Sequence, residues 1–277
     1  MQETKHVALQ SPGAWWRDAV TYQIYIRSFA DSNGDGKGDI EGIRSRLPYL
    51  KKLGIDAIWI TPWYVSPQKD HGYDTADYMD IDPTYGSLAD AERLIKEAAE
   101  MGIRTIVDIV PNHSSDQHAW FQEALNSEPG SAARDRYMFR DGKGANGELP
   151  PNDWESCFGG SAWHRVTEKD GKPGQWYLHL FAVEQPDFNW ANEEVREHFD
   201  QVLKFWLDRG VAGFRIDVAH GMIKAPGLPD VKSHNEGLLD ASARPFWNQP
   251  GVHEIYRRWR KILDSYPGDR MAVAEAW

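Results

Sequence analysis

Apolar residues along the chain follow two spacings that alternate with each other. Short runs of apolar residues predict five strands, at residues 20–26, 55–60, 103–110, 211–217 and 271–276. Between these runs, apolar residues recur every three or four positions, which predicts amphipathic helices at residues 40–54, 87–102, 192–210 and 252–266. Strands that alternate with helices pair in parallel through right-handed crossovers. The pattern therefore indicates an α/β fold built on a parallel sheet.

The ends of the first two helices carry residues that favour such ends. Gly54 and Gly102 follow these helices, and glycine readily takes the left-handed conformation in which many helices terminate. Ser87 precedes the second helix as its expected N-cap, with Asp90 in the first turn.

Polar residues gather where the predicted strands end. They are Asp108, Asn112, His113, Arg215, Asp217 and Glu275. No GxGxxG motif follows the first strand, which weakens the dinucleotide-binding form of an open sheet. Barrel enzymes keep their catalytic residues at the carboxyl ends of the strands. We therefore predict the first five strands of a (β/α)8 barrel, the TIM-barrel fold.

The alternation stops between residues 114 and 187. Segments such as SEPGSAARD, RDGKGANGELPPND and EKDGKPGQ are rich in Gly, Pro and charge, and together they are too long for an ordinary loop. We expect a small irregular subdomain inserted after the third strand. The predicted parts are the first part of the barrel at 1–113, with a loose tail at 1–14, the insertion at 114–187, and the barrel continued through its fifth strand at 188–277.

Composition narrows the class of protein. The 277 residues carry a net charge of −11 and no run of Lys or Arg, so we expect neither nucleic acid nor a membrane surface as a partner. Cys157 is the only cysteine, which rules out an internal disulfide framework. The sequence also lacks an apolar run of membrane-spanning or signal-peptide length, so a cytoplasmic location is expected. It does not predict an oligomeric state.

Two acidic residues at strand ends indicate glycoside cleavage. Arg215 and Asp217 are two positions apart, so both side chains face the barrel mouth, and Glu275 ends another strand. Retaining glycosidases use two carboxylates about 5–5.5 Å apart, one as nucleophile and one as acid and base. Arg215 is expected to lower the pKa of Asp217 and keep it ionised. The alternative reading is a buried structural ion pair.

Three nearby polar residues are candidates for sugar binding. Asp70 can accept hydrogen bonds from hydroxyl groups, and Tyr73 can stack against a sugar ring. His113 ends the third strand without the partner spacing of a zinc site. Each of these residues could instead be purely structural.

The segment DSNGDGKGD predicts a calcium loop. It places hard oxygen donors at positions 1, 3, 5, 7 and 9, from Asp31, Asn33, Asp35, the carbonyl of Lys37, and Asp39. Gly42 stands where an EF-hand has Glu, so we expect a structural Ca²⁺ and not a calcium switch. An Asn/Asp/Gly turn without metal is the alternative.

These motifs together resemble the α-amylase superfamily of glycoside hydrolases, in its α-glucosidase and oligo-1,6-glucosidase branch. The resemblance extends along almost the whole chain, through WWRDAVTYQIYIRSFADSNGDGKGDIEGI, LKKLGIDAIWITP, SPQKDHGYD, DIVPNHSSDQH, FGGSAWH, YLHLFAVEQPDFNW, GFRIDVAHG and AEAW. The element QPDFNW is similar to the QPDLN element of this branch.

The resemblance implies a role for each candidate residue. Asp217 would be the nucleophile and Glu275 the general acid and base. The terminal glucose would be bound by Asp70, Tyr73, His113, Phe158, Phe181 and Arg215, with Gln185 nearer the leaving group, and the calcium by the loop at 31–39. The insertion would make the site a pocket, which implies exo-acting release of glucose from short oligosaccharides with α-1,4 or α-1,6 links.

Two features of the sequence bear on specificity and completeness. Val218, after the nucleophile, matches branch members that favour α-1,6 links. The family's third catalytic carboxylate, an Asp preceded by His, would lie beyond Trp277, as would the remaining strands. A barrel of five strands has open edges, so we expect these 277 residues alone to be inactive and poorly soluble.

Two other functions fit the same resemblance. A transglycosylating relative, such as a trehalose synthase or sucrose isomerase, would use the same two carboxylates but keep the sugar for transfer. A non-catalytic amylase-like protein, such as the accessory subunit of an amino-acid transporter, would not require them.

Overall fold

The computed structural model describes residues 14–231 and 244–276. Its main sheet has five strands in the order β1-β2-β5-β9-β10, and every pair is parallel. The strands are β1 (Thr21–Ile24), β2 (Ala57–Ile60), β5 (Arg104–Ile109), β9 (Gly213–Ile216) and β10 (Met271–Ala274). Each of the five predicted strands is present at its expected place. The loose tail expected at 1–14 lies almost entirely outside the described residues.

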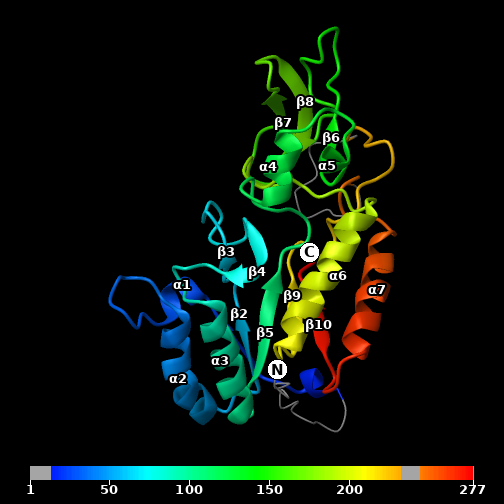
Figure 1. Cartoon of the computed structure of the whole chain (residues 1–277). Helices are drawn as coiled ribbons and strands as arrows, with labels where there is room; N and C mark the ends of the chain where they lie inside the picture. Colours follow the sequence, from blue (N-terminus) through cyan, green and yellow to red (C-terminus); the bar gives the residue numbers. More distant parts are fainter. Residues whose placement is uncertain (1–13, 232–243, 277) are drawn as a thin grey trace, which may run out of the picture.

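Four long helices pack along the sheet. They are α2 (Ile40–Leu53), α3 (Leu88–Glu100), α6 (Glu193–Asp208) and α7 (Val252–Asp264) (Figure 1). Their buried residues are the apolar positions that recur at helical spacing, such as Ile43, Leu47 and Leu50 in α2. None of the helices in the described ranges is long and apolar enough to span a membrane.

The helix ends follow the local signals in the sequence. Gly54 ends α2 with a φ of 86°, in the left-handed region that glycine adopts most readily. Ser87 and Asp90 form a reciprocal capping box at the start of α3.

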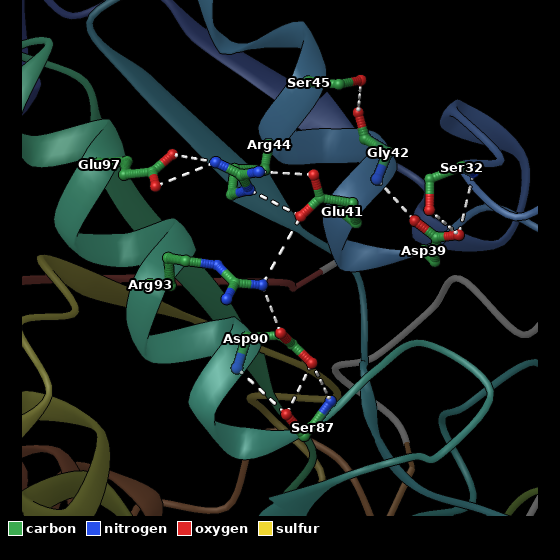
Figure 2. A network of polar contacts seen from close by, with 10 residues as sticks. All are labelled: Ser32, Asp39, Glu41, Gly42, Arg44, Ser45, Ser87, Asp90, Arg93 and Glu97. Carbon is green, nitrogen blue, oxygen red and sulfur yellow. Dashed lines mark hydrogen bonds and ion pairs between the residues drawn. The ribbon is translucent and has the colours of Figure 1, made fainter.

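Helices α2 and α3 are also joined by a polar network on their outer surface. Figure 2 shows Arg44 of α2 between Glu41 and Glu97, with contacts of 2.6 and 2.9 Å. Arg93 of α3 lies 3.6 Å from Glu41 and 2.5 Å from Asp90. These charges are partly exposed, so packing of the apolar faces holds the two helices together more than the ion pairs do.

Several short elements lie outside the predicted alternation. The 3-10 helix η1 (Trp15–Arg17) precedes β1, and the helix α1 (Ile26–Phe29) occupies the end of the segment expected as the first strand. The hairpin of β3 (Tyr64–Val65) and β4 (Asp77–Ile81) lies in the loop after β2. This hairpin carries the segment that contains Asp70 and Tyr73.

Residues 114–187 contain more regular structure than their composition indicates. The helices α4 (Ala119–Leu125) and α5 (Ala132–Asp135) lie beside an antiparallel sheet of β6 (Phe139–Arg140), β7 (Trp163–Thr167) and β8 (Pro173–Leu178). The segment stands above the carboxyl ends of the main strands (Figure 1). A bridge between His113 and Asp187 ties its end to the exit of β5.

The main sheet is open at both edges within the described part of the chain. β1 pairs only with β2, and β10 pairs only with β9. Val273 in β10 is 46% exposed, although a barrel strand in the middle of a closed sheet would be covered. The sheet is thus a partial barrel.

Candidate active site

Three neighbouring strands bring the charged residues of the site to one edge of the sheet. In the parallel register, Asp108 of β5 pairs with Arg215 of β9, and Arg215 pairs with Val273 of β10. Asp217 and Glu275 directly follow the last residues of β9 and β10. The strand ends therefore bring three acidic residues to a single arginine.

A cavity of about 280 Å³ opens at this edge. It is lined by Asp70, Tyr73, His113, Phe158, Phe181, Arg215, Asp217, Val218 and Glu275. Two cavities of about 620 Å³ lie elsewhere, and their lining includes neither Asp217 nor Glu275. Every residue proposed from the sequence as catalytic or substrate-binding lines the cavity, except Gln185.

Arg215 holds the acidic residues in place. Its Nη1 donates to Asp217 Oδ1 at 2.6 Å and to Asp108 Oδ1 at 2.8 Å, while its Nη2 lies 2.7 Å from Glu275 Oε1. The guanidinium also lies over the ring of Tyr73, 5.8 Å from its centroid. Because one planar fork contacts both Asp217 and Glu275, these two carboxylates face the same small space.

Asp108 is a site residue for which the sequence analysis assigns no individual role. Its side chain is fully buried, and its Oδ2 accepts a hydrogen bond of 2.8 Å from Trp59 Nε1. Its backbone carbonyl accepts from the hydroxyl of Tyr64. Asp108 therefore holds the guanidinium of Arg215 in place. The two residues are neighbours because β5 and β9 pair in this register.

The backbone after β9 orients Glu275. Val218 has a φ of 45°, which is unusual for a β-branched residue and indicates local strain. In this conformation its N–H donates to Glu275 Oε2 at 3.0 Å. One carboxylate oxygen of Glu275 thus meets Arg215 and the other meets the backbone amide of Val218.

Arg215 acts on Asp217 in the expected direction, but the net pKa of Asp217 is set by other groups. Burial raises the pKa of Asp217 above its usual value, and the nearby carboxylates of Asp108 and Glu275 raise it further. Arg215 opposes them only in part. Burial likewise raises the pKa of Asp108 to about 6, against the effect of Arg215. Arg215 does lower the pKa as expected, but its effect is outweighed because one cation faces three carboxylates around the buried Asp217.

A second group of polar residues lies on the side of the inserted segment. Gln185 is fully buried, and its Nε2 donates to Asp70 Oδ2 at 2.9 Å and lies 3.1 Å from His113 Nε2. Its Oε1 accepts from the N–H of Ala182. The amide is therefore fully engaged with Asp70, His113 and Ala182, two of which line the cavity. Burial raises the pKa of Asp70, with Gln185 opposing the shift.

Aromatic side chains complete the wall of the cavity. Phe158 and Phe181 come from the inserted segment and meet edge to face at 5.7 Å. Phe181 also contacts the ring of His113 at 5.2 Å, while Phe158 is mostly exposed. These rings supply apolar surface of the kind that covers the faces of a sugar.

The loop at 31–37 has the oxygen donors that Ca²⁺ prefers. Asp31 accepts N–H groups from Asn33, Gly34 and Gly36, and Asn33 and Asp35 accept from Asp35 and Lys37 respectively. These bonds curl the loop around the side-chain oxygens of Asp31, Asn33 and Asp35.

Asp39, the last of the predicted donors, also accepts hydrogen bonds within the protein. Its Oδ1 caps α2 by accepting from the N–H of Gly42, and its Oδ2 accepts from Ser32 (Figure 2). Among residues 14–231 and 244–276, no three His, Cys, Asp or Glu side chains are grouped as metal ligands. A calcium ion in the loop would therefore depend on Asn33 and the carbonyl of Lys37 as well as on the carboxylates.

Known proteins are similar to this chain in sequence and in fold. The catalytic-domain model of the alpha-amylase family matches residues 23–277. An oligo-1,6-glucosidase of Parageobacillus thermoglucosidasius is 47% identical over 262 residues, which are 94% of this chain and 45% of that protein. A trehalose-6-phosphate hydrolase of Escherichia coli K12 is 51% identical over 94% of this chain and 44% of its own length.

The solved structures lead to the same family. The trehalulose synthase MutB of Pseudomonas mesoacidophila MX-45 superimposes with a TM-score of 0.85 at 43% identity, over 95% of this chain and 46% of that chain. The chain spans somewhat less than half the length of the curated relatives it matches. It belongs to the α-amylase family, whose catalytic domain is a (β/α)8 barrel, and it contains the N-terminal part of that barrel.

Proposed function

We propose that the protein containing this chain is a retaining, exo-acting α-glucosidase that releases terminal α-linked glucose from short oligosaccharides. The observation that carries the proposal is the single guanidinium of Arg215 that contacts both Asp217 and Glu275 at the base of a cavity. Relatives named oligo-1,6-glucosidase, 44–47% identical over 94% or more of the chain, support the substrate class.

The two carboxylates divide the reaction between them. Asp217 attacks the anomeric carbon and forms a covalent glucosyl–enzyme, while Glu275 gives its proton to the departing oxygen. Glu275 then takes a proton from water, which attacks the same carbon and releases glucose with its configuration retained. The first step of this mechanism requires an ionised nucleophile at Asp217 and a proton on Glu275.

The charge balance of the site favours the transition state. The reacting sugar acquires positive charge as the glycosidic bond breaks. Asp108, Asp217 and Glu275 surround a single arginine, so the site has an excess of negative charge available to a positively charged sugar. Fixed groups in a site shielded from water stabilise such a charge without the reorganisation that water requires.

The cavity walls account for selection of chain ends. Phe158 and Phe181 from the inserted segment close one side, while Asp70 and His113 offer polar atoms to the hydroxyls of a terminal sugar. A volume of about 280 Å³ holds about one glucose unit. Val218 lines the same cavity and offers only methyl groups there, whereas a Thr at this position would offer a hydroxyl group. On this basis we propose a preference for α-1,6 over α-1,4 links.

A transfer reaction is the second candidate. The MutB structure is a trehalulose synthase, and an α-glucosyl transfer enzyme, XgtA, superimposes with a TM-score of 0.86 at 41% identity, over 96% of this chain and 50% of that chain. Transfer would use the same covalent intermediate with a sugar in place of water. Chromatography of the products separates the two, because transfer yields rearranged disaccharide with little free glucose.

The test uses the full-length protein, since we propose that the 277 residues alone are inactive. The wild type should hydrolyse isomaltose or maltose in a panel with sucrose, trehalose and trehalose 6-phosphate. Asp217→Asn should lower kcat by about 10⁴-fold or more. Asp170→Asn, an exposed position of the inserted segment, is the control and should keep full activity. Substantial turnover by Asp217→Asn would rule out Asp217 as the nucleophile.

We further propose a structural Ca²⁺ in the loop after β1, bound by Asp31, Asn33, Asp35, the carbonyl of Lys37 and Asp39. The curled loop and its oxygen donors support the proposal. The metal would fix the turn before α2 and take no part in the chemistry. We also propose a cytoplasmic location, since a single cysteine needs no oxidising compartment.

A further inference from the structure

A buried lysine lies behind the proposed site and has no role in the chemistry described above. The side chain of Lys224 is only 2% exposed, and its ammonium lies 2.7 Å from Asp187 Oδ2. It also donates to Asn112 Oδ1 at 2.8 Å and to the carbonyl of Gly221. A buried charge is retained only where it is paired and hydrogen-bonded, and this one joins three distant segments of the chain.

Lys224 and Asp187 together fix the orientation of the Asn112 amide. An ammonium group can only donate, so the Asn112 atom that faces Lys224 must be the oxygen. An ionised carboxylate can only accept, so the atom 3.0 Å from Asp187 Oδ2 must be the amide nitrogen. Both constraints place the Asn112 oxygen toward Lys224 and its nitrogen toward Asp187. The chemistry of the two partners therefore fixes which end of the amide is which.

The oriented amide decides which nitrogen of His113 carries the proton. Asn112 Nδ2 lies 3.2 Å from His113 Nδ1, so Nδ1 accepts and has no hydrogen. Burial lowers the pKa of His113 to about 4, so the ring is neutral near pH 7. The proton is then on Nε2, which lies 3.2 Å from the backbone carbonyl of Tyr73 and donates to it.

The opposite tautomer satisfies fewer neighbours. With the proton on Nδ1, Nε2 could accept from Gln185 Nε2 at 3.1 Å. However, Nδ1–H would face the amide hydrogens of Asn112, and the bare Nε2 would face the carbonyl oxygen of Tyr73. The Nε2–H form makes two of the three hydrogen bonds and the Nδ1–H form makes one, and an unmade hydrogen bond in a buried site is costly.

We propose that Lys224 and Asp187 are positioning residues, which fix His113 in the Nε2–H tautomer through Asn112 so that the ring presents a hydrogen-bond donor to the sugar. The effect on sugar binding rests on the proposed α-glucosidase function. The tautomer of His113 does not depend on that function. The Nε2 side of the ring lies toward Tyr73, which lines the same cavity as His113. A hydroxyl oxygen bound in the cavity would therefore share the Nε2–H with the Tyr73 carbonyl, as the second acceptor of a three-centre hydrogen bond.

The first experiment measures the tautomer in the native protein. Histidine is labelled with ¹⁵N in the full-length protein, and the ring signals of His113 are assigned by their loss in His113→Gln. The chemical shifts of the two ring nitrogens at pH 7 should show Nε2 protonated and Nδ1 bare. A ring protonated on Nδ1, or on both nitrogens, would overturn the proposal without any further variant.

The second experiment reverses the constraint. The double variant Asp187→Asn with Lys224→Met changes no net charge and nearly keeps the side-chain shapes. The introduced amide would offer its NH₂ group where Asp187 Oδ2 now accepts, and no ammonium would face Asn112. The Asn112 amide should then turn over, present its oxygen to Nδ1, and shift the proton of His113 from Nε2 to Nδ1.

Activity and a matched control complete the test. In the double variant kcat/KM for the terminal glucoside should fall about tenfold, as expected for one lost hydrogen bond. The control is Asp170→Asn with Lys172→Met, an exposed ion pair at 2.6 Å, and it should leave both the ring signals and kcat/KM unchanged. A folded double variant that keeps Nε2–H would overturn the role of Lys224 and Asp187. A protein without glucosidase activity would overturn the proposed function alone, because the ring signals are read independently.

Discussion

Replacing Arg215 by methionine should make the stability of the protein strongly dependent on pH. Arg215 contacts three carboxylates at 2.6 to 2.8 Å, and the side chains of Asp108 and Asp217 are 0% and 9% exposed. Methionine keeps an unbranched apolar stem but lacks the charged guanidinium. The substitution therefore leaves buried carboxylates without the cation that they share.

The loss of unfolding free energy is set by the less costly of two outcomes: leaving the carboxylates unpaired, or protonating one of them. Removing one partner of a buried ion pair costs about 3–5 kcal/mol. The alternative is to protonate a carboxyl group, which costs about 5 kcal/mol at pH 7.5 and about 1.5 kcal/mol at pH 5 for an ordinary Asp. The variant should therefore lose about 3–5 kcal/mol of unfolding free energy at pH 7.5 but only about 1–2 kcal/mol at pH 5.

The sign of this dependence follows from proton binding. In the folded variant, the pKa values of Asp108 and Asp217 lie above those in the unfolded chain, because they already do so in the wild type. The folded state then binds more protons than the unfolded state, so stability falls as pH rises from about 4 through the raised pKa values.

The assay is urea unfolding of the full-length protein at pH 5 and pH 7.5, followed by tryptophan fluorescence. The control is Arg257→Met, which removes an exposed pair with Glu254 and should cost less than about 1 kcal/mol at either pH. Equal losses for Arg215→Met at the two pH values would show that the carboxylates around Arg215 are not destabilised by charge.

Two other predictions concern the acid limb of the pH profile and the calcium loop. Asp108→Asn removes a charge that raises the pKa of Asp217, so the acid limb of kcat/KM should move to lower pH; a shift to higher pH would contradict the assigned electrostatics. Ca²⁺ at about 100 times its dissociation constant should stabilise the protein by about 2.7 kcal/mol, and a chelator should reverse this in a thermal melt. Asp31→Ala should abolish the response, whereas the exposed control Asp170→Asn should retain it. An identical melting temperature with and without chelator would refute the calcium site.

Much of the fold could be predicted from the sequence because its signals are local. The spacing of apolar residues located all five main strands and the four long helices to within a few residues. Ser87 and Gly54 marked helix ends through contacts with their immediate neighbours. Motif resemblance selected the residues that line the cavity, and the parallel strand ends explain why they meet.

Other features depend on partners that are distant in the chain. The pairing of β7 with β8 and the hairpin of β3 and β4 lie in segments whose composition shows no clear period. Lys224 is one lysine in a loop of the sequence, yet its partners Asp187 and Asn112 lie 37 and 112 positions away. No local pattern could identify these contacts.

The sequence by itself determined the order of strands and helices and the identity of the acidic residues at the strand ends. The tertiary structure decided their electrostatics. From the sequence, Arg215 is the nearest charge to Asp217 and should keep its pKa low. In the folded protein, burial and the carboxylate of Asp108 outweigh Arg215 and raise it. The exclusion of water and the approach of residues from other strands are properties of the fold, and they set the energy of a buried charge.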